Sequence, residues 1–178
     1  MASESERFPW FEAVQGDDLA QGDILDELRS FAFDAATSAG ASDATLSWVQ
    51  RDAIVMTQSC DLVAEQKIIN EVLLCAVWKR SDDPDFQRDD VMESIRCGRQ
   101  YRYHMLAESR MPGLERSYRI VDFSRVTVYP LEVLRVRAAA AGPRLRLLPP
   151  YREHMSQAFA RFFMRVGLPA DIPRFRKK

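Results

Sequence analysis

The order of apolar and polar positions along the chain predicts a sheet built from short strands. Two apolar runs, residues 46–57 and 68–78, are rich in β-branched and aromatic side chains and too short to favour helices, so they predict strands. Arg51 and Asp52 interrupt the first run and predict the tip of a hairpin. A two-residue alternation predicts further strands at residues 101–106, 116–128 and 144–148.

Two segments have the spacing of a helix. Residues 88–99 place Val91, Met92 and Ile95 on one side and end at Gly98, which predicts a short helix inserted between strands. A longer C-terminal helix after residue 150 is predicted by an apolar stripe of Tyr151, Met155, Ala158, Phe159, Phe162, Phe163 and Val166.

Together these elements predict one α+β domain. It has a small, mostly antiparallel sheet or barrel of about six to seven strands, one inserted short helix and a long C-terminal helix. Residues 30–45, rich in Ala, Ser and Gly, predict a mobile loop, and residues 131–134 predict a helical turn before a linker at 138–142. The chain divides into an acidic N-terminal extension (residues 1–18), the domain (19–169) and a basic tail (170–178).

Composition agrees with one soluble domain and excludes several classes of protein. The chain has 178 residues, 47% of them hydrophobic and 29% charged. No apolar run approaches the roughly 20 residues of a membrane helix, so we expect a cytoplasmic protein with no membrane partner. Cys60, Cys75 and Cys97 form no CxxC pair, which argues against a disulfide framework and a zinc site. With no glycine-rich phosphate loop either, we expect neither a metal nor a cofactor.

The net charge of −1 hides a separation of charge along the chain. Residues 1–43 carry a net charge of −8 and residues 44–93 one of −5, whereas residues 94–178 carry +12. The basic segment interleaves arginines with tyrosines, a combination that grips phosphates and stacks on bases. We therefore predict contact with RNA or single-stranded DNA through Arg99, Arg102, Tyr103, Arg116, Tyr118 and Arg119.

The same charge pattern can arise without nucleic-acid binding in two ways. Arginine outnumbers lysine 21 to 4, which a GC-rich genome produces without selection for binding. The acidic N-terminal segment could also fold over the basic face of the domain.

Gln58-Ser59-Cys60-Asp61 is the densest group of reactive side chains, and it follows a predicted strand, where loop chemistry is often placed. A nucleophilic cysteine needs a base, which His104 would supply if its strand lay beside Cys60. The alternative is that Cys60 is a small apolar residue at a strand end and His104 a surface residue.

A short phrase, Gln21-Gly22-Asp23-Ile24, precedes the apolar strand at residues 53–57, which ends in Thr57. This arrangement resembles the MazF/PemK (CcdB-like) group of small SH3-like barrels. The resemblance implies an SH3-like β-barrel and a metal-independent endoribonuclease of a toxin–antitoxin or defence system. It also implies that Arg51 and either Thr57 or Ser59 occupy the active positions. The chain departs from the pattern at Asp52, where the toxins prefer proline.

The sequence thus predicts a PemK/MazF-like barrel protein that binds nucleic acid through its Arg/Tyr-rich face. Two alternatives from other classes stay open. One is a non-catalytic module that binds a protein partner or forms a homodimer, and the other is an enzyme that depends on Cys60.

Overall fold

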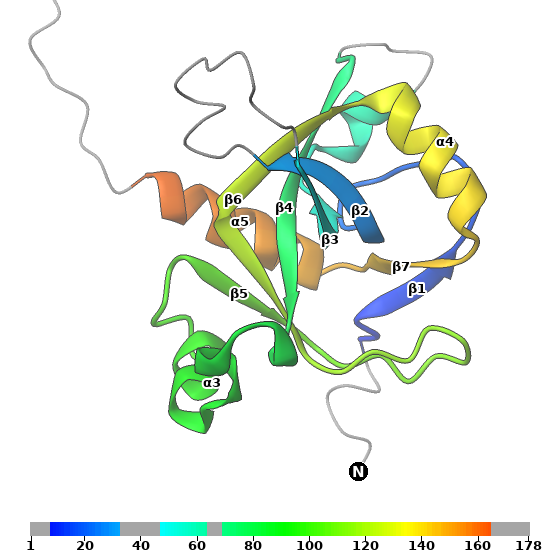
Figure 1. The fold of residues 1–178 in the computed structure, drawn as a ribbon. Helices are drawn as coiled ribbons and strands as arrows, with labels where there is room; N and C mark the ends of the chain where they lie inside the picture. The colour runs from blue at the N-terminus through cyan, green and yellow to red at the C-terminus, as the bar shows by residue number, and fades with distance from the viewer. Residues whose placement is uncertain (1–7, 33–46, 64–68, 165–178) are drawn as a thin grey trace, which may run out of the picture.

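Strands in two antiparallel sheets form the body of the protein in a computed structural model that describes residues 8–32, 47–63 and 69–164 (Figure 1). The strands are β1 (Phe11–Val14), β2 (Ile24–Ala32), β3 (Ser47–Val55), β4 (Glu71–Lys79), β5 (Tyr103–Leu106), β6 (Arg119–Pro130) and β7 (Arg144–Leu147). The larger sheet has the order β2-β3-β4-β6-β5, and the smaller sheet pairs β1 with β7.

Helices and single turns connect and cover these strands. The helices of the described ranges are α3 (Asp89–Arg96), α4 (Leu131–Ala141) and α5 (Tyr151–Phe163). Short 3-10 turns lie at η1 (Ser59–Leu62), η2 (Arg80–Asp82) and η3 (Pro84–Gln87).

Alternation along β4 divides the larger sheet into two covered faces. Val72 and Leu74 point to one face, where α4 packs on them, and Trp78 lies on the same face beneath α3. Cys75 and Val77 point to the other face, where α5 and the smaller sheet cover them. We refer to these as the α3/α4 face and the α5 face.

Gly22 joins the two sheets. Its N–H donates to the carbonyl of Val55 at the end of β3 (2.9 Å), and its carbonyl accepts from the N–H of Leu147 in β7 (3.0 Å). Its φ of +89° is in the left-handed region, and a Cβ at this position would lie 2.9 Å from the Cβ of Leu147. Only glycine fits both the conformation and the close approach.

A buried carboxylate strengthens this junction. Asp23 is fully buried and accepts hydrogen bonds from Arg144 Nε (2.9 Å) and from an Nη of Arg146 (3.0 Å), both on β7. The Gly-Asp phrase singled out in the sequence therefore has a structural role, which is to attach the smaller sheet to the larger one.

The prediction of an α+β chain with mostly antiparallel strands is confirmed, but the predicted barrel is not closed. Through Gly22 and an isolated bridge between Asp23 and Arg146, the smaller sheet continues the larger one. The combined arrangement ends at β1 on one side and β5 on the other, and no ladder joins these two strands in the described ranges.

Three predicted elements differ from the structure. The chain runs straight through Arg51 and Asp52 as part of β3, so the predicted hairpin tip there is wrong. The strand pair predicted at residues 116–128 is one long strand, β6, bent by a bulge opposite Cys75 and Ala76. The predicted linker at 138–142 is the last turn of α4, which extends to Ala141.

Other predictions are confirmed. The inserted helix α3 ends before Gly98, whose φ is +66°, and α5 follows the two prolines. Phe163 is an exception to the predicted apolar stripe, because its side chain is 54% exposed.

Residues 11–14 of the predicted N-terminal extension form β1, and residues 30–32 of the predicted mobile loop belong to β2. Residues 1–7, 33–46 and 165–178, which include the basic tail, lie outside the described ranges.

Candidate functional site

The hydroxyl groups of the resemblance pattern fix the turn after β3. Thr57 Oγ1 accepts from the N–H of Leu73 (2.8 Å), and Ser59 Oγ accepts from the N–H of Gln21 (3.1 Å). Arg51 is six residues before Thr57, or about 20 Å along an extended chain. The structure does not bring Arg51 next to either hydroxyl group.

Cys60 and His104 are also far apart. Cys60 lies in η1 after β3, whereas His104 lies on β5, and β4 and β6 separate these strands by about 14 Å. The two residues are also offset along the strands. The end of β3 lies opposite Leu74 of β4, which pairs with Thr127 of β6. β5 pairs with residues 119–122, at the other end of β6. Cys60 is exposed, with its thiol 3.6 Å from Asp61 Oδ1. The predicted thiol–imidazole pair does not form.

Two arginines stack on one indole on the α3/α4 face. The guanidinium carbon of Arg51 lies 5.1 Å from the ring centroid of Trp78, and that of Arg125 lies 5.5 Å from the same ring. Pairing of β3 with β4 places Arg51 beside Trp78, and the β6 bulge carries Arg125 over the ring. Desolvation lowers the pKa of Arg51, and the positive charge of Arg125 lowers it further.

A third arginine lies on the neighbouring strand pair. Arg102 donates from Nε and an Nη to both oxygens of Asp122 (2.9 and 2.7 Å), and its guanidinium lies 4.8 Å from the ring centroid of Tyr103. Asp122 is fully buried, which raises its pKa, but hydrogen bonds from Arg102 and Ser124 outweigh burial and leave the pKa below its ordinary value.

These residues form one cationic, aromatic surface, which we name the Arg–aromatic patch: Arg51, Trp78, Arg102, Tyr103, Asp122 and Arg125. Three guanidinium groups are offset by the single carboxylate of Asp122, and Arg102 already occupies both of its oxygens. Arg125 reaches the same carboxylate only at 3.9 Å and is 50% exposed. The patch therefore has a surplus of positive charge.

Only part of this patch could be predicted from the sequence. Arg102 and Tyr103 were predicted to bind nucleic acid, and Arg51 was predicted as a catalytic residue. Trp78 was missed, and so was the pairing of Asp122 with arginines, because both roles depend on which strands pair. Only the run of arginines gave any signal for Arg125.

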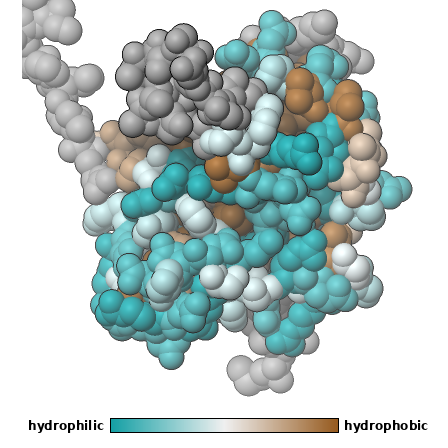
Figure 2. Space-filling view, in the orientation of Figure 1, coloured by the Kyte–Doolittle hydropathy of each residue, from teal (hydrophilic) through white to brown (hydrophobic). Residues whose placement is uncertain are grey.

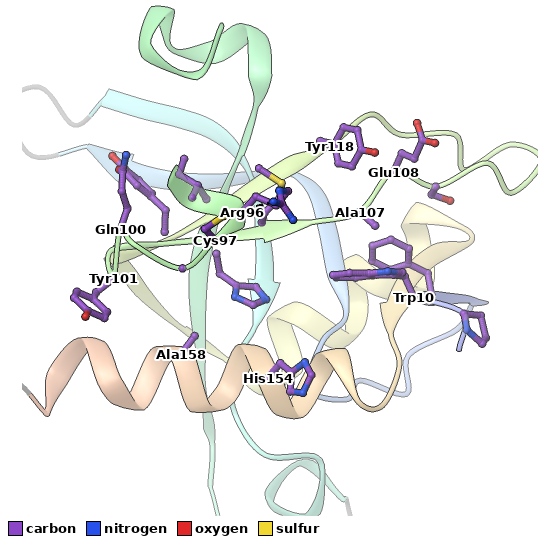
Figure 3. A pocket seen from close by; sticks show the side chains of 18 of the residues that line it. Trp10, Arg96, Cys97, Gln100, Tyr101, Ala107, Glu108, Tyr118, His154 and Ala158 are labelled. Carbon is purple, nitrogen blue, oxygen red and sulfur yellow. Dashed lines mark hydrogen bonds between the residues drawn. The ribbon is translucent and has the colours of Figure 1, made fainter. Parts of the chain in front are cut away.

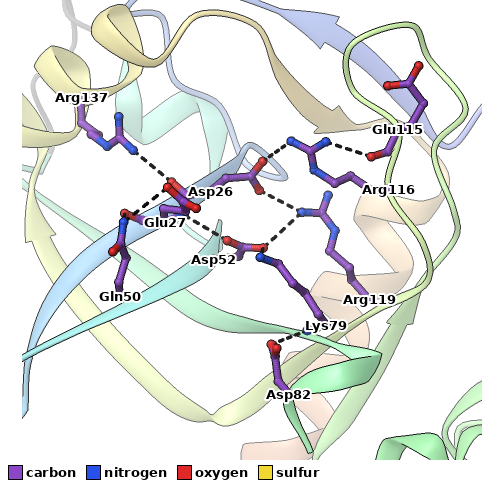
Figure 4. A network of polar contacts seen from close by, with 10 residues as sticks. All are labelled: Asp26, Glu27, Gln50, Asp52, Lys79, Asp82, Glu115, Arg116, Arg119 and Arg137. Atoms are coloured by element: carbon purple, nitrogen blue, oxygen red, sulfur yellow. Dashed lines mark hydrogen bonds and ion pairs between the residues drawn. The ribbon is translucent and has the colours of Figure 1, made fainter.

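Arg116, which precedes β6, and Arg119, the first residue of β6, were also predicted to bind nucleic acid. Both belong instead to a polar network at the bulge of β2 (Figure 4). Arg116 and Arg119 bind the two oxygens of Asp26 at 2.7 and 3.0 Å. The Arg119 side chain is only 3% exposed and also lies 3.8 Å from Asp52. Arg119 therefore stabilises the fold by binding carboxylates of β2 and β3.

Arg99 and Tyr118 are exposed, but neither belongs to the patch. Tyr118 lies at the rim of a cleft of about 960 Å³ (Figure 3). Figure 3 shows His154 and Ala158 projecting from α5 toward β5, with Trp10 at one end of the cleft and Tyr101 at the other. The Trp10 ring stacks on Tyr151 at 3.7 Å, so the aromatic segment before β1 docks on α5.

His104 lies in the wall of this cleft and is largely buried against Phe123. Desolvation lowers its pKa to about 4, with a smaller contribution from His154. Its Nε2 is buried and has no hydrogen-bond partner within the described residues. The imidazole is therefore neutral at neutral pH.

Comparison of the chain with protein-family models, curated proteins and solved structures found no match. Among the residues that the structure describes, no group of three or more His, Cys, Asp or Glu side chains is placed to hold a metal ion. No helix in the same ranges is both long and apolar enough to cross a membrane.

Proposed function

We propose that the Arg–aromatic patch binds single-stranded nucleic acid, either RNA or DNA. The observation that carries the proposal is the placement of Arg51 and Arg125 at the Trp78 ring, where the ion pairing of these two guanidinium groups within the described residues is limited to the 3.9 Å contact of Arg125 with Asp122. Beyond the effect of desolvation, the charge of Arg125 lowers the pKa of Arg51, which means that the two cations repel each other, and a bound anion would relieve that repulsion.

The chemistry of the side chains favours a polynucleotide over a single small anion. Guanidinium groups bind phosphate oxygens with two parallel hydrogen bonds and also stack on bases. The patch repeats one combination, an arginine over an aromatic ring, at Trp78 on β4 and again at Tyr103 on β5, with β6 between these strands. A surface with repeated cations and rings suits a flexible strand of alternating phosphates and bases.

The ribonuclease activity implied by the MazF/PemK resemblance is not part of this proposal, because Arg51 does not approach Thr57 or Ser59. We do infer that the two sheets are an opened form of an SH3-like barrel. The continuous link from β7 through Gly22 to β3 supports this inference.

Binding of a fluorescein-labelled 15-nucleotide oligo(U) or oligo(dT), followed by anisotropy at low salt, tests the proposal. We expect Arg51→Gln with Arg125→Gln to weaken binding by at least about tenfold for both oligonucleotides, because phosphate contacts are lost.

Arg29→Gln is the matched control. Arg29 is an exposed arginine on β2, and its register partner Gln50 points away from the face that carries Arg51. An equal loss of affinity in Arg29→Gln and in the patch variant would show that only the overall charge of the protein matters. No binding of either oligonucleotide by the unaltered protein would refute the proposal.

A further inference from the structure

The outer edge of β5 is available for hydrogen bonding. The N–H of Phe123 in β6 donates to the carbonyl of Arg102 (2.9 Å), so in the β5–β6 register His104 and Leu106 direct their backbone groups toward β6. The N–H and carbonyl of Met105 then point away from β6. No hydrogen bond from the described part of the chain reaches them.

This free edge lies in the cleft of Figure 3. Tyr103, His104 and Met105 all line the cleft. Because successive side chains of a strand point to opposite faces of the sheet, a cleft that contacts all three must lie along the edge of β5 and not on one face. The end of α3 forms one wall, through Ile95 and Cys97, and α5 forms the other.

The wall formed by α5 leaves room beside the strand. His154, Ala158 and Arg161 line the cleft at spacings of four and three residues, which is one stripe of the helix. Met155 and Phe159 of the neighbouring stripe pack into the core, and Ala158 also contacts the core. The small side chain of Ala158 stands at the centre of the wall.

Apart from its short length, β5 has none of the features by which proteins protect an exposed strand edge. Such edges are usually blocked by charged side chains, proline or a bulge, or they are covered. The opposite edge strand, β2, has a bulge between Leu25 and Leu28. The sequence of β5, Tyr-His-Met-Leu, has no proline and no full charge, since His104 is neutral, and its register with β6 is regular.

The charges of the cleft select the kind of partner. Arg96 is paired with Glu93 and Arg110 with Glu108. Arg161 is exposed and forms no ion pair with any carboxylate of the described ranges. A partner with a carboxylate near Arg161 would therefore satisfy the cation that has no counter-charge.

We propose that the cleft binds an extended acidic peptide, which adds a strand to the free edge of β5 and places a carboxylate side chain at Arg161. The outward N–H of Tyr103 already donates to the carbonyl of Gln100 (3.0 Å), so the peptide would pair mainly through Met105 while lying along the roughly 13 Å of β5. Backbone hydrogen bonds to Met105 would supply affinity, and Arg161 and the cleft walls would supply selectivity. The proposal rests on observations other than those for the Arg–aromatic patch, which lies on the α3/α4 face, although Tyr103 borders both sites.

The experiment uses the full chain and a pool of blocked pentapeptides with aspartate at both ends and mixed residues between. Amide hydrogen exchange of Met105, measured by NMR, is expected to slow at least about tenfold when the pool is added. Met105→Pro removes the outward N–H without removing a bond to β6, and it should abolish binding, whereas Met105→Leu should keep it.

Ala158→Trp fills the cleft and should abolish binding, whereas Ala160→Trp, on an exposed position of the same helix, should bind as the unaltered protein does. Arg161→Gln should weaken binding several-fold. The proposal is overturned if the exchange rate of Met105 does not change, if Ala158→Trp binds as well as Ala160→Trp, or if the chain instead forms a dimer that Met105→Pro abolishes. If circular dichroism shows that Met105→Pro or Ala158→Trp melts at a lower temperature than the unaltered protein, the other of these two variants decides the test.

Discussion

His104 links the stability of the protein to pH. Its pKa is lowered from 6.5 to about 4 by burial, so between these values the unfolded chain binds a proton that the folded chain does not. We predict that the free energy of unfolding falls by about 2 to 3 kcal/mol as the pH is lowered through this window.

Urea unfolding of the unaltered protein and of His104→Leu at pH 4.5, 5.5, 6.5 and 7.5 measures this dependence. The loss of stability below pH 6.5 should become smaller in His104→Leu. His154→Gln, which changes an exposed imidazole, should keep most of it. An identical pH profile in His104→Leu would show that another group causes the acid dependence.

Individual residue roles could be predicted from the sequence only where they do not depend on distant partners. Arg102 and Arg119 look alike in the sequence, and both were predicted to face nucleic acid. The buried pairing of Arg119 with Asp26, 93 residues away, cannot be seen without the strand order. In the same way, Arg51 and Trp78 meet only because β3 pairs with β4.

At the scale of elements, the junction between the sheets depends on Asp23. Removing its charge leaves Arg144, which is only 4% exposed, without its carboxylate. We expect Asp23→Asn to lower the free energy of unfolding by about 3 kcal/mol, as measured by urea denaturation, because a buried charge loses its partner.

Asp90→Asn is the control for this prediction, since Asp90 is an exposed carboxylate that pairs with Arg88 on the surface. It should change stability by less than about 1 kcal/mol. A loss in Asp23→Asn no larger than that of Asp90→Asn would contradict the structural role of the Gly-Asp phrase.

Elements with a strong apolar period were predicted correctly, and those without one were not. β4 buries a continuous run of apolar side chains, and α5 packs a clear apolar stripe against the core. The C-terminal part of α4 is Arg-Ala-Ala-Ala-Ala, which has high helix propensity but no apolar stripe to reveal it. The polar pair Arg51 and Asp52 does not break β3, because Trp78 contacts the first and Lys79 pairs with the second.

At the scale of the whole molecule, the fold brings the acidic and basic segments of the chain together. Asp23 and Asp26 of the acidic segment neutralise arginines of the basic one, on β7 and around β6. Part of the separation of charge seen in the sequence is therefore internal. What remains at the surface is smaller and more local, and the Arg–aromatic patch is its clearest part.

The surface in the orientation of Figure 2 is mostly hydrophilic, with apolar side chains gathered over α4. Val133 and Val136 of this helix are 53% and 71% exposed. Two valines make a small apolar area, so charge is the main feature by which this surface would select a partner.

The salt dependence of binding to 15-nucleotide oligo(U) tests the central claim most directly, because it counts the phosphate contacts that the patch makes. Each contact to a single strand contributes about −0.7 to the slope of log K against log salt concentration, so three arginines predict a slope of about −2. The variant Arg51→Gln with Arg125→Gln should reduce the slope to about −0.7. A slope that this variant leaves unchanged, or no binding at low salt, would contradict the account.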